Sequence, residues 1–122
     1  MNPRLVIGCN AVIRSGSVIY AGCELGENFA TGHAAVIREG TKVGHHSRIG
    51  THSDIQGDCE IGDYVRIHSN VITSQRVKIH DFVWILPHVC WPTARIHRQR
   101  KVFPATVEAY AVIAANSVIL PE

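Results

Sequence analysis

Histidine is the residue of this chain best suited to acid–base chemistry, because an imidazole with a pKa near 6.5 takes and returns a proton at neutral pH. The chain has eight histidines, and two of them, His33 and His68, lie in short polar segments between apolar residues. Similar segments hold His52, Ser69, Asn70 and His88. Side chains of these types could exchange a proton with a bound ligand and hydrogen-bond to it.

A second group is the densest basic run of the chain, which contains Arg95, His97, Arg98, Arg100 and Lys101. Guanidinium groups bind phosphate through paired hydrogen bonds, so the run predicts a phosphate clamp, with a solvated charged surface as the alternative. Four aromatic residues flank it: Trp84, Trp91, Phe103 and Tyr110. Each could stack on a planar base, but for Trp84 and Phe103 we favour packing at the root of the segment.

The four cysteines, Cys9, Cys23, Cys59 and Cys90, show no CxxC or CxxxC spacing. The sequence therefore predicts neither a zinc knuckle nor a dithiol redox pair. We expect free thiols that act as small apolar side chains in or near a core.

The composition indicates one compact domain over residues 1–122, because 46% of the residues are hydrophobic and 18% are charged. The net charge of +2 is too small to predict a nucleic-acid partner. The apolar runs are far shorter than the roughly 18 residues of a membrane helix, and the N-terminus lacks the apolar core of a signal peptide. We therefore expect a cytoplasmic protein without a membrane partner.

The element that must position the polar side chains is a repeat of six residues. Counting from Ile7 to Ile85, twelve of the fourteen hexads begin with Ile, Leu or Val, and the exceptions are Thr31 and Thr73. These three residue types account for 32 of the 122 residues, so chance would give roughly four in fourteen. The excess indicates one buried side chain in every hexad.

The other positions of the hexad indicate a short strand followed by a tight corner. The fifth residue is small or β-branched except at Phe29, and the second is often glycine. The third and fourth are mostly polar or turn-forming, and a helical period is absent. A strand and a corner repeated every six residues predict an all-β fold, a parallel β-helix whose coils stack about 4.8 Å apart.

These hexads resemble the repeats of the hexapeptide-repeat acyltransferases, in which Ile, Leu or Val is followed by Gly and the fifth position is small. The resemblance implies a left-handed β-helix of triangular section, with three hexads in each coil and about six coils in all. The regular hexads cover residues 7–90, the repeat fails at residues 91–106, and it resumes over residues 107–122. We expect the interruption to be one extruded loop that carries the basic run.

Three hexads in each coil place residues that differ by 18 in one column. The histidines expected on one corner are His33, His52, His68 and His88, whereas His45 and His80 fall on another. Two coils separate His52 from His88, and likewise Cys23 from Cys59, a rise of roughly 9.6 Å. We therefore expect no disulfide between those cysteines and no metal bound within one chain.

Four segments resemble the branch of this family that acetylates amino groups on nucleotide-linked sugars: residues 31–39, 49–53, 57–65 and 67–71. The resemblance implies acetyl-CoA as co-substrate and a homotrimer with sites between subunits. It places His33 and Asn70 near the acceptor. We expect His33 to be the base, His68 to be the second candidate and Asn70 to orient the acceptor.

The remaining site residues follow from the same interpretation. Ser69, His52 and His88 are expected to complete the acceptor site. The residues expected to bind coenzyme A are Arg95, Arg98, Arg100, Lys101, Ala115 and Asn116. Backbone N–H groups at the corners are expected to stabilise the oxyanion. Two departures from the family pattern stand out: Gly57 replaces a histidine that is catalytic in a related group, and Tyr110 and Ala114 replace glycines near the coenzyme.

Together these observations predict an acetyl-CoA-dependent acyltransferase whose acceptor is an amino sugar linked to a nucleotide. A non-catalytic hexapeptide scaffold or binding protein is a first alternative, which the departures near the coenzyme would fit. A second is a γ-class carbonic anhydrase-like metalloprotein with zinc between subunits, although its usual histidine pair with four intervening residues is absent. The identity of the acceptor, and whether its nitrogen or oxygen is acylated, stays open.

Overall fold

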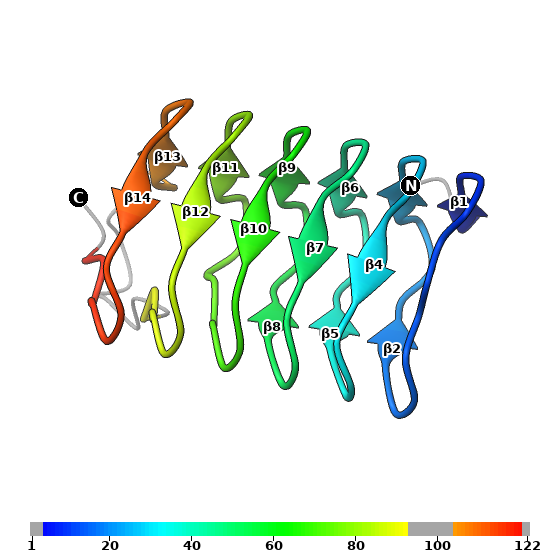
Figure 1. Cartoon of the computed structure of the whole chain (residues 1–122), viewed down its shortest axis with the longest axis horizontal. Coiled ribbons are helices and arrows are strands. Elements are labelled where there is room, and N and C mark those ends of the chain that lie inside the picture. The colour runs from blue at the N-terminus through cyan, green and yellow to red at the C-terminus, as the bar shows by residue number, and fades with distance from the viewer. Residues whose placement is uncertain (1–3, 93–103, 121–122) are drawn as a thin grey trace, which may run out of the picture.

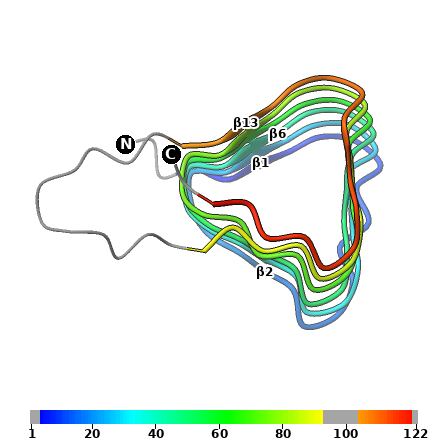
Figure 2. The same cartoon turned by 90° about the vertical axis from the view of Figure 1, so that its left-hand side faces the viewer.

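The protein is a parallel β-solenoid. A computed structural model describes residues 4–92 and 104–120, which form fourteen two-residue strands and no helix (Figure 1). Seen along its axis, the solenoid has a triangular section, so that each coil crosses three faces joined by three corners (Figure 2). The predicted all-β fold of stacked hexads is confirmed. Since the described residues hold no helix, none could span a membrane.

Each face is a parallel sheet with one strand from each coil. The first face contains β1 (Val6–Ile7), β3 (Glu24–Leu25), β6 (Lys42–Val43), β9 (Glu60–Ile61), β11 (Lys78–Ile79) and β13 (Thr106–Val107). The second face contains β4 (Ala30–Thr31), β7 (Arg48–Ile49), β10 (Arg66–Ile67), β12 (Trp84–Ile85) and β14 (Val112–Ile113). The third face contains β2 (Val18–Ile19), β5 (Val36–Ile37) and β8 (Asp54–Ile55), continued by single bridges at Ile72, Cys90 and Val118.

The register of the strands gives the length of a coil. On the third face, Val18, Val36, Asp54, Ile72 and Cys90 pair in succession at steps of 18 residues, which makes four uninterrupted turns. The next step on this face, from Cys90 to Val118, takes 28 residues. The last turn therefore contains ten residues more than the repeat, and residues 93–103 within it lie outside the described residues.

The solenoid extends further on both sides of this interruption than the hexad count predicts. Trp91 is buried at the first position of a hexad, and its backbone N–H donates to the carbonyl oxygen of Ile72. Thr106 lies in β13, and the carbonyl oxygen of Ala105 accepts a hydrogen bond from Lys78. Trp91 and Thr106, at the two ends of the expected interruption, thus pair with neighbouring coils.

From Leu25 to Trp91 the first residue of each hexad is buried inside the prism, where it forms the core, whereas Ile7 and Ile13 in the first coil are each 40% exposed. Ile37, Ile49, Ile55 and Ile85 have no exposed surface, and Thr31 and Thr73, the two polar exceptions, are also buried. At the corners the chain turns through a residue in the left-handed region, such as His46 with φ 60°. The coils approach so closely there that a Cβ on Gly44 would lie 2.7 Å from the carbonyl carbon of Gly62. This contact explains the glycines at the second position.

Small hydroxyl side chains at the fifth position connect successive coils inside the corners. Ser47 Oγ donates to the carbonyl oxygen of Gly62 at 2.7 Å and accepts the N–H of Val65 at 3.0 Å. Ser53 Oγ bonds to His68 and Val71 in the same way. Each hydroxyl thus satisfies backbone groups of the next coil, which is why a buried polar residue is tolerated at this position.

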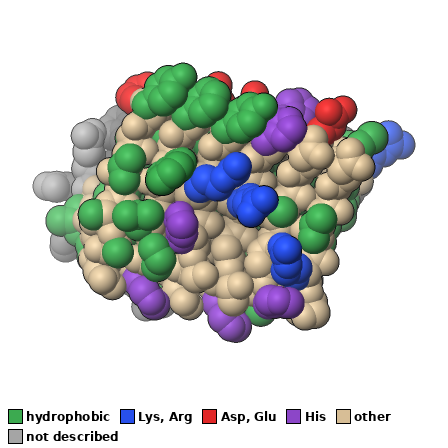
Figure 3. Space-filling model, in the orientation of Figure 1, with side chains coloured by type: hydrophobic (Ala, Val, Ile, Leu, Met, Phe, Trp, Pro, Cys, Tyr) green, Lys and Arg blue, Asp and Glu red, His purple; other side chains and the backbone are tan. Residues whose placement is uncertain are grey.

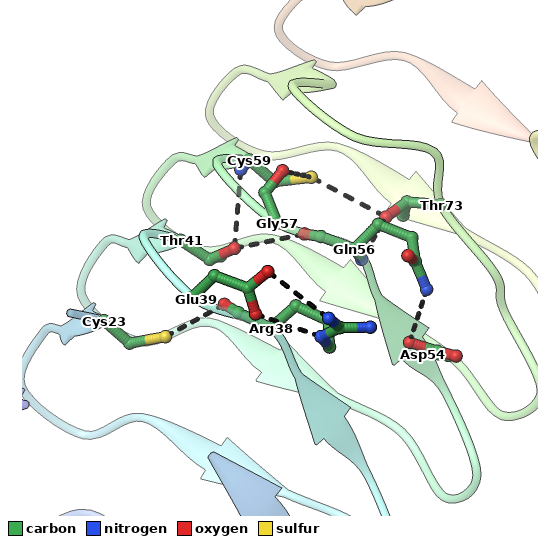
Figure 4. A network of polar contacts seen from close by, with 9 residues as sticks. All are labelled: Cys23, Arg38, Glu39, Thr41, Asp54, Gln56, Gly57, Cys59 and Thr73. Carbon is green, nitrogen blue, oxygen red and sulfur yellow. Dashed lines mark hydrogen bonds and ion pairs between the residues drawn. The ribbon is translucent and has the colours of Figure 1, made fainter. Parts of the chain in front are cut away.

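The third corner, between the third and first faces at residues 20–23, 38–41, 56–59 and 74–77, holds the two buried cysteines within a polar network (Figure 4). Cys23 Sγ donates to the carbonyl oxygen of Arg38 at 3.1 Å, and Cys59 Sγ donates to that of Ser74 at 3.3 Å. Burial raises the pKa of both thiols, so they stay protonated at neutral pH and are poor nucleophiles. All four cysteines are free thiols; Cys23 and Cys59 lie in the core as expected, whereas Cys9 is exposed.

Candidate functional site

The second corner, between the second and third faces, gathers most of the residues that the sequence singles out. It consists of residues 14–17, 32–35, 50–53, 68–71, 86–89 and 114–117. His52, Asn70 and His88 occupy one column and have positive φ values between 57° and 64°. The column predicted from the 18-residue coil is confirmed. Figure 3 shows histidine side chains along the lower edge of the face that carries β4, β7, β10, β12 and β14.

His33 lies one coil before His52 and is exposed at the corner. Its ring Nδ1 is 3.0 Å from Ser15 Oγ, and its backbone N–H donates to Thr51 Oγ1 at 3.2 Å. When the ring is in the tautomer that donates Nδ1–H to Ser15, the lone pair of Nε2 faces away from that bond. Ser15 therefore orients the imidazole so that it can accept a proton from a ligand.

His68 and Ser69 line a groove of about 300 Å³ on the second face. The coil that contains Gly50 and Thr51 separates them from His33, a rise of roughly 9.6 Å between His33 and the coil of His68. Within one chain the two candidate bases therefore do not form a contacting pair. Asn70, His52 and His88 are exposed and lie outside the lining of this groove.

Three backbone N–H groups of the corner are already used between coils and are therefore not available as the expected oxyanion donors. The N–H of His52 donates to His33, that of Asn70 donates to Thr51, and that of His88 donates to Ser69. These donors cannot turn to a reacting oxygen without breaking the stack. The Asn70 amide and the Ser69 hydroxyl are side-chain donors at the same corner.

Three arginines of the groove were missed by the sequence interpretation: Arg14, Arg48 and Arg66. Arg48 and Arg66 are Cα partners on β7 and β10, at the outward position next to a buried isoleucine. Arg66 Nη1 donates to the carbonyl oxygen of His46 at 2.6 Å, and Arg14 Nη1 donates to that of Thr31 at 2.8 Å. The 18-residue spacing of Arg48 and Arg66 was the available signal. Lysine and arginine side chains occupy the middle of the view in Figure 3.

The sequence interpretation also missed an aromatic ladder along the first corner, which lies between the first and second faces. His46, Tyr64, Phe82 and Tyr110 follow one another in successive coils, with ring centroids 4.7, 5.1 and 5.0 Å apart. Neighbouring rings are nearly parallel, with interplanar angles of 12°, 3° and 3°. Because each ring covers the next, the ladder stabilises the corner, and only the terminal Tyr110 keeps a largely exposed ring at 73%.

The two tryptophans have different environments, and one expectation about them was wrong. Trp84 points outward on β12 and is 53% exposed, so it does not pack at the root of the interruption. Trp91 is the buried tryptophan, and its Nε1 has no hydrogen-bond partner among the described residues. The reason is the register, since Trp84 stands at the outward sixth position and Trp91 at the inward first position.

The expected coenzyme residues fall into two groups. Arg95, Arg98, Arg100, Lys101 and also Phe103 lie outside the described residues. Ala115 and Asn116 are exposed at the second corner in the last coil, and the N–H of Asn116 donates to the carbonyl oxygen of Pro87. Asn116 continues the column of Asn70 and His88 toward the end of the solenoid, and Ala115 lies in the neighbouring column of Ser69.

A larger groove of about 470 Å³ lies on the first face and includes His45, His80 and Asp81. Its outward side chains alternate in charge, and Lys78 Nζ lies 3.8 Å from Glu60 Oε2. His45 Nδ1 accepts the N–H of Glu27 at 2.8 Å, which engages that ring in coil stacking. The separate placement of His45 and His80 is as expected. The described residues contain no group of three or more His, Cys, Asp or Glu side chains that could hold one metal ion.

Comparison with known families identifies the repeat. Residues 40–75 match the family model described as bacterial transferase hexapeptide (six repeats). The matched segment runs from the third corner through β6–β10 and includes His68, Ser69 and Asn70. A search of curated proteins gives no match to the chain.

Proposed function

We propose that this chain, whose residues 40–75 carry the repeat of the bacterial transferase hexapeptide family, is an acetyl-CoA-dependent acyltransferase. That family consists largely of acyltransferases, and acyl-CoA is their common donor. The observation that carries the proposal is the second corner, where an oriented imidazole, a hydroxyl and an amide adjoin an arginine-lined groove. The proposed acceptor is an amino sugar linked to a nucleotide.

The reaction needs a base, an oxyanion donor and a route for one proton. The acceptor nitrogen attacks the thioester carbonyl, a C–N bond forms, and the C–S bond breaks as the coenzyme leaves as its thiol. His33 Nε2 takes the proton of the attacking amine and returns it to the leaving sulfur. The Asn70 amide and Ser69 hydroxyl of a neighbouring subunit hold the acceptor and the oxyanion, because within one chain they lie two coils from His33.

A site shared between subunits requires an oligomer, and we propose a homotrimer. The third face supports self-association, since its outward column is apolar apart from Asp54: Val18, Val36, Ile72, Cys90 and Val118. Val18, Ile72 and Val118 are 50%, 44% and 58% exposed. An exposed column of mainly apolar side chains is typical of an interaction surface.

Light scattering at micromolar concentration checks the assembly. We expect a trimeric mass for the unmodified protein and a smaller mass for Ile72→Lys, because the substitution places a charge in the mainly apolar column. Glu24→Lys on the first face is the control and is expected to keep the trimer. A stable monomer for the unmodified protein would contradict the proposed assembly.

Titration with acetyl-CoA tests the proposed function against the scaffold alternative. We expect calorimetry to show saturable binding of acetyl-CoA. The heat of binding should disappear when free coenzyme A already fills the site. The absence of detectable binding at millimolar acetyl-CoA would favour a non-catalytic scaffold. Stoichiometric zinc in the purified protein would instead favour the metalloprotein alternative.

A further inference from the structure

We infer that the second face carries a binding site for a nucleoside diphosphate group, formed by Arg48, Arg66 and Trp84. The inference rests on the proposed function, because coenzyme A and nucleotide-linked sugars both contain such a group. It assigns the phosphates to the second face and not to the basic run at residues 95–101. None of the three is a residue proposed for the chemical step, although Arg48 and Arg66 share a groove with His68 and Ser69.

The first argument is an uncompensated pair of positive charges. Arg48 and Arg66 face each other as Cα partners on adjacent parallel strands, about 4.8 Å apart. Like charges directly opposite each other on a sheet are destabilising. Among the described residues, no carboxylate forms an ion pair with either arginine. An anion bound between them would remove this repulsion.

The first face shows how the same fold arranges charges elsewhere. At the equivalent outward position its strands carry Glu24, Lys42, Glu60 and Lys78, so that every charge has an opposite charge as its Cα partner. The alternation compensates each charge within the chain. On the second face the outward neighbours of the arginine pair are uncharged, Ala30 on one side and Trp84 on the other, so neither arginine has an opposite charge as its Cα partner.

The second argument is that the arginine side chains are oriented within a groove. Arg66 Nη1 donates to the carbonyl oxygen of His46, which fixes the guanidinium and leaves its other N–H groups available. Arg48 and Arg14 line the same groove of about 300 Å³, together with His68 and Ser69. A held guanidinium loses little freedom when it binds phosphate through paired hydrogen bonds.

The third argument is the aromatic side chain next to the arginines. Trp84 on β12 is the Cα partner of Arg66, points outward and is 53% exposed. Its indole is therefore available to stack on a base, unlike the inner rings of the first-corner ladder, Tyr64 and Phe82, which have a ring on each side. Arg48, Arg66 and Trp84 thus place two phosphate-binding groups and one stacking group on three successive strands.

Calorimetric titration with ADP, UDP and inorganic pyrophosphate tests the site. We expect the double variant Arg48→Gln/Arg66→Gln to weaken binding of all three by at least about tenfold, because each arginine contributes charge-assisted hydrogen bonds. Trp84→Phe is expected to weaken the nucleotides and to leave pyrophosphate unchanged. The control Lys42→Gln/Lys78→Gln removes two cations from equivalent positions of the first face and is expected to bind as the unmodified protein does.

The two nucleotides distinguish the source of the diphosphate. Tighter binding of ADP assigns the site to coenzyme A, and tighter binding of UDP assigns it to the nucleotide of the acceptor. Failure of all three ligands to bind, or equal losses in the arginine and lysine double variants, would overturn the inference even if the protein transfers acetyl groups. Arginine-dependent pyrophosphate binding in a protein that transfers no acetyl group would support the inference and refute the proposed function.

Discussion

His33→Ala is expected to lower acetyl transfer by about 10²- to 10⁴-fold without loss of the oligomer, since a positioned base contributes a factor of that size. The ring is exposed at the second corner and contributes no core packing. Its loss removes the group that accepts the proton of the attacking nitrogen. Turnover at saturating substrates, measured beside light scattering and thermal unfolding, separates this effect from misfolding.

His80→Ala is the matched control, because His80 is also an exposed histidine but lies on the first face. Its turnover is expected to stay close to that of the unmodified protein. Equal losses in both variants would refute the assignment of His33. So would unchanged turnover of His33→Ala across pH 6 to 9, in which case His68 becomes the candidate base.

Ile61→Asp is expected to abolish soluble folded protein. Ile61 is 4% exposed at the inward position of β9, between Val43 and Ile79 on the adjacent strands. An unpaired carboxylate buried there costs several kcal/mol, which is comparable with the whole free energy of unfolding of a small domain. Soluble yield and thermal unfolding followed by circular dichroism measure the effect.

Val112→Asp introduces the same side chain at an outward position of β14, where Val112 is 64% exposed. We expect this variant to fold with nearly unchanged stability. An unchanged melting temperature for Ile61→Asp would show that the inward register is wrong. Comparable losses in the two variants would show that the solenoid does not tolerate aspartate on either side of its wall.

The fold could be predicted because a β-solenoid repeats the same short strand and corner in every hexad. In each hexad the first residue points inward and the chain turns at the third and fourth residues. The six-residue period therefore predicts both the strands and the corners. The register even places Trp91, six residues after Ile85, in the core. Our expectation for Trp84 was wrong because nearness to the interruption was weighed above the position in the hexad.

The candidate site was predicted in part, for a related reason. Columns of residues follow from the 18-residue coil, so the sequence alone could assign His33, His68 and Asn70 to one corner. The hydrogen bond between His33 Nδ1 and Ser15 Oγ, and the use of the His52, Asn70 and His88 N–H groups between coils, depend on three-dimensional geometry. The period of the buried hydrophobic residues contains no information on the outward side chains. It therefore did not predict the roles of Arg48 and Arg66 or the aromatic ladder.

The central claim is that this solenoid transfers an acetyl group, and release of the coenzyme thiol measures it most directly. A thiol reagent follows the reaction of acetyl-CoA with nucleotide-linked amino sugars, with the corresponding hydroxyl sugars in parallel. The account predicts thiol release that depends on both the protein and an amino acceptor, and that falls at least about 100-fold in His33→Ala. Thiol release no faster than in buffer with every acceptor, from protein that binds acetyl-CoA, would contradict it.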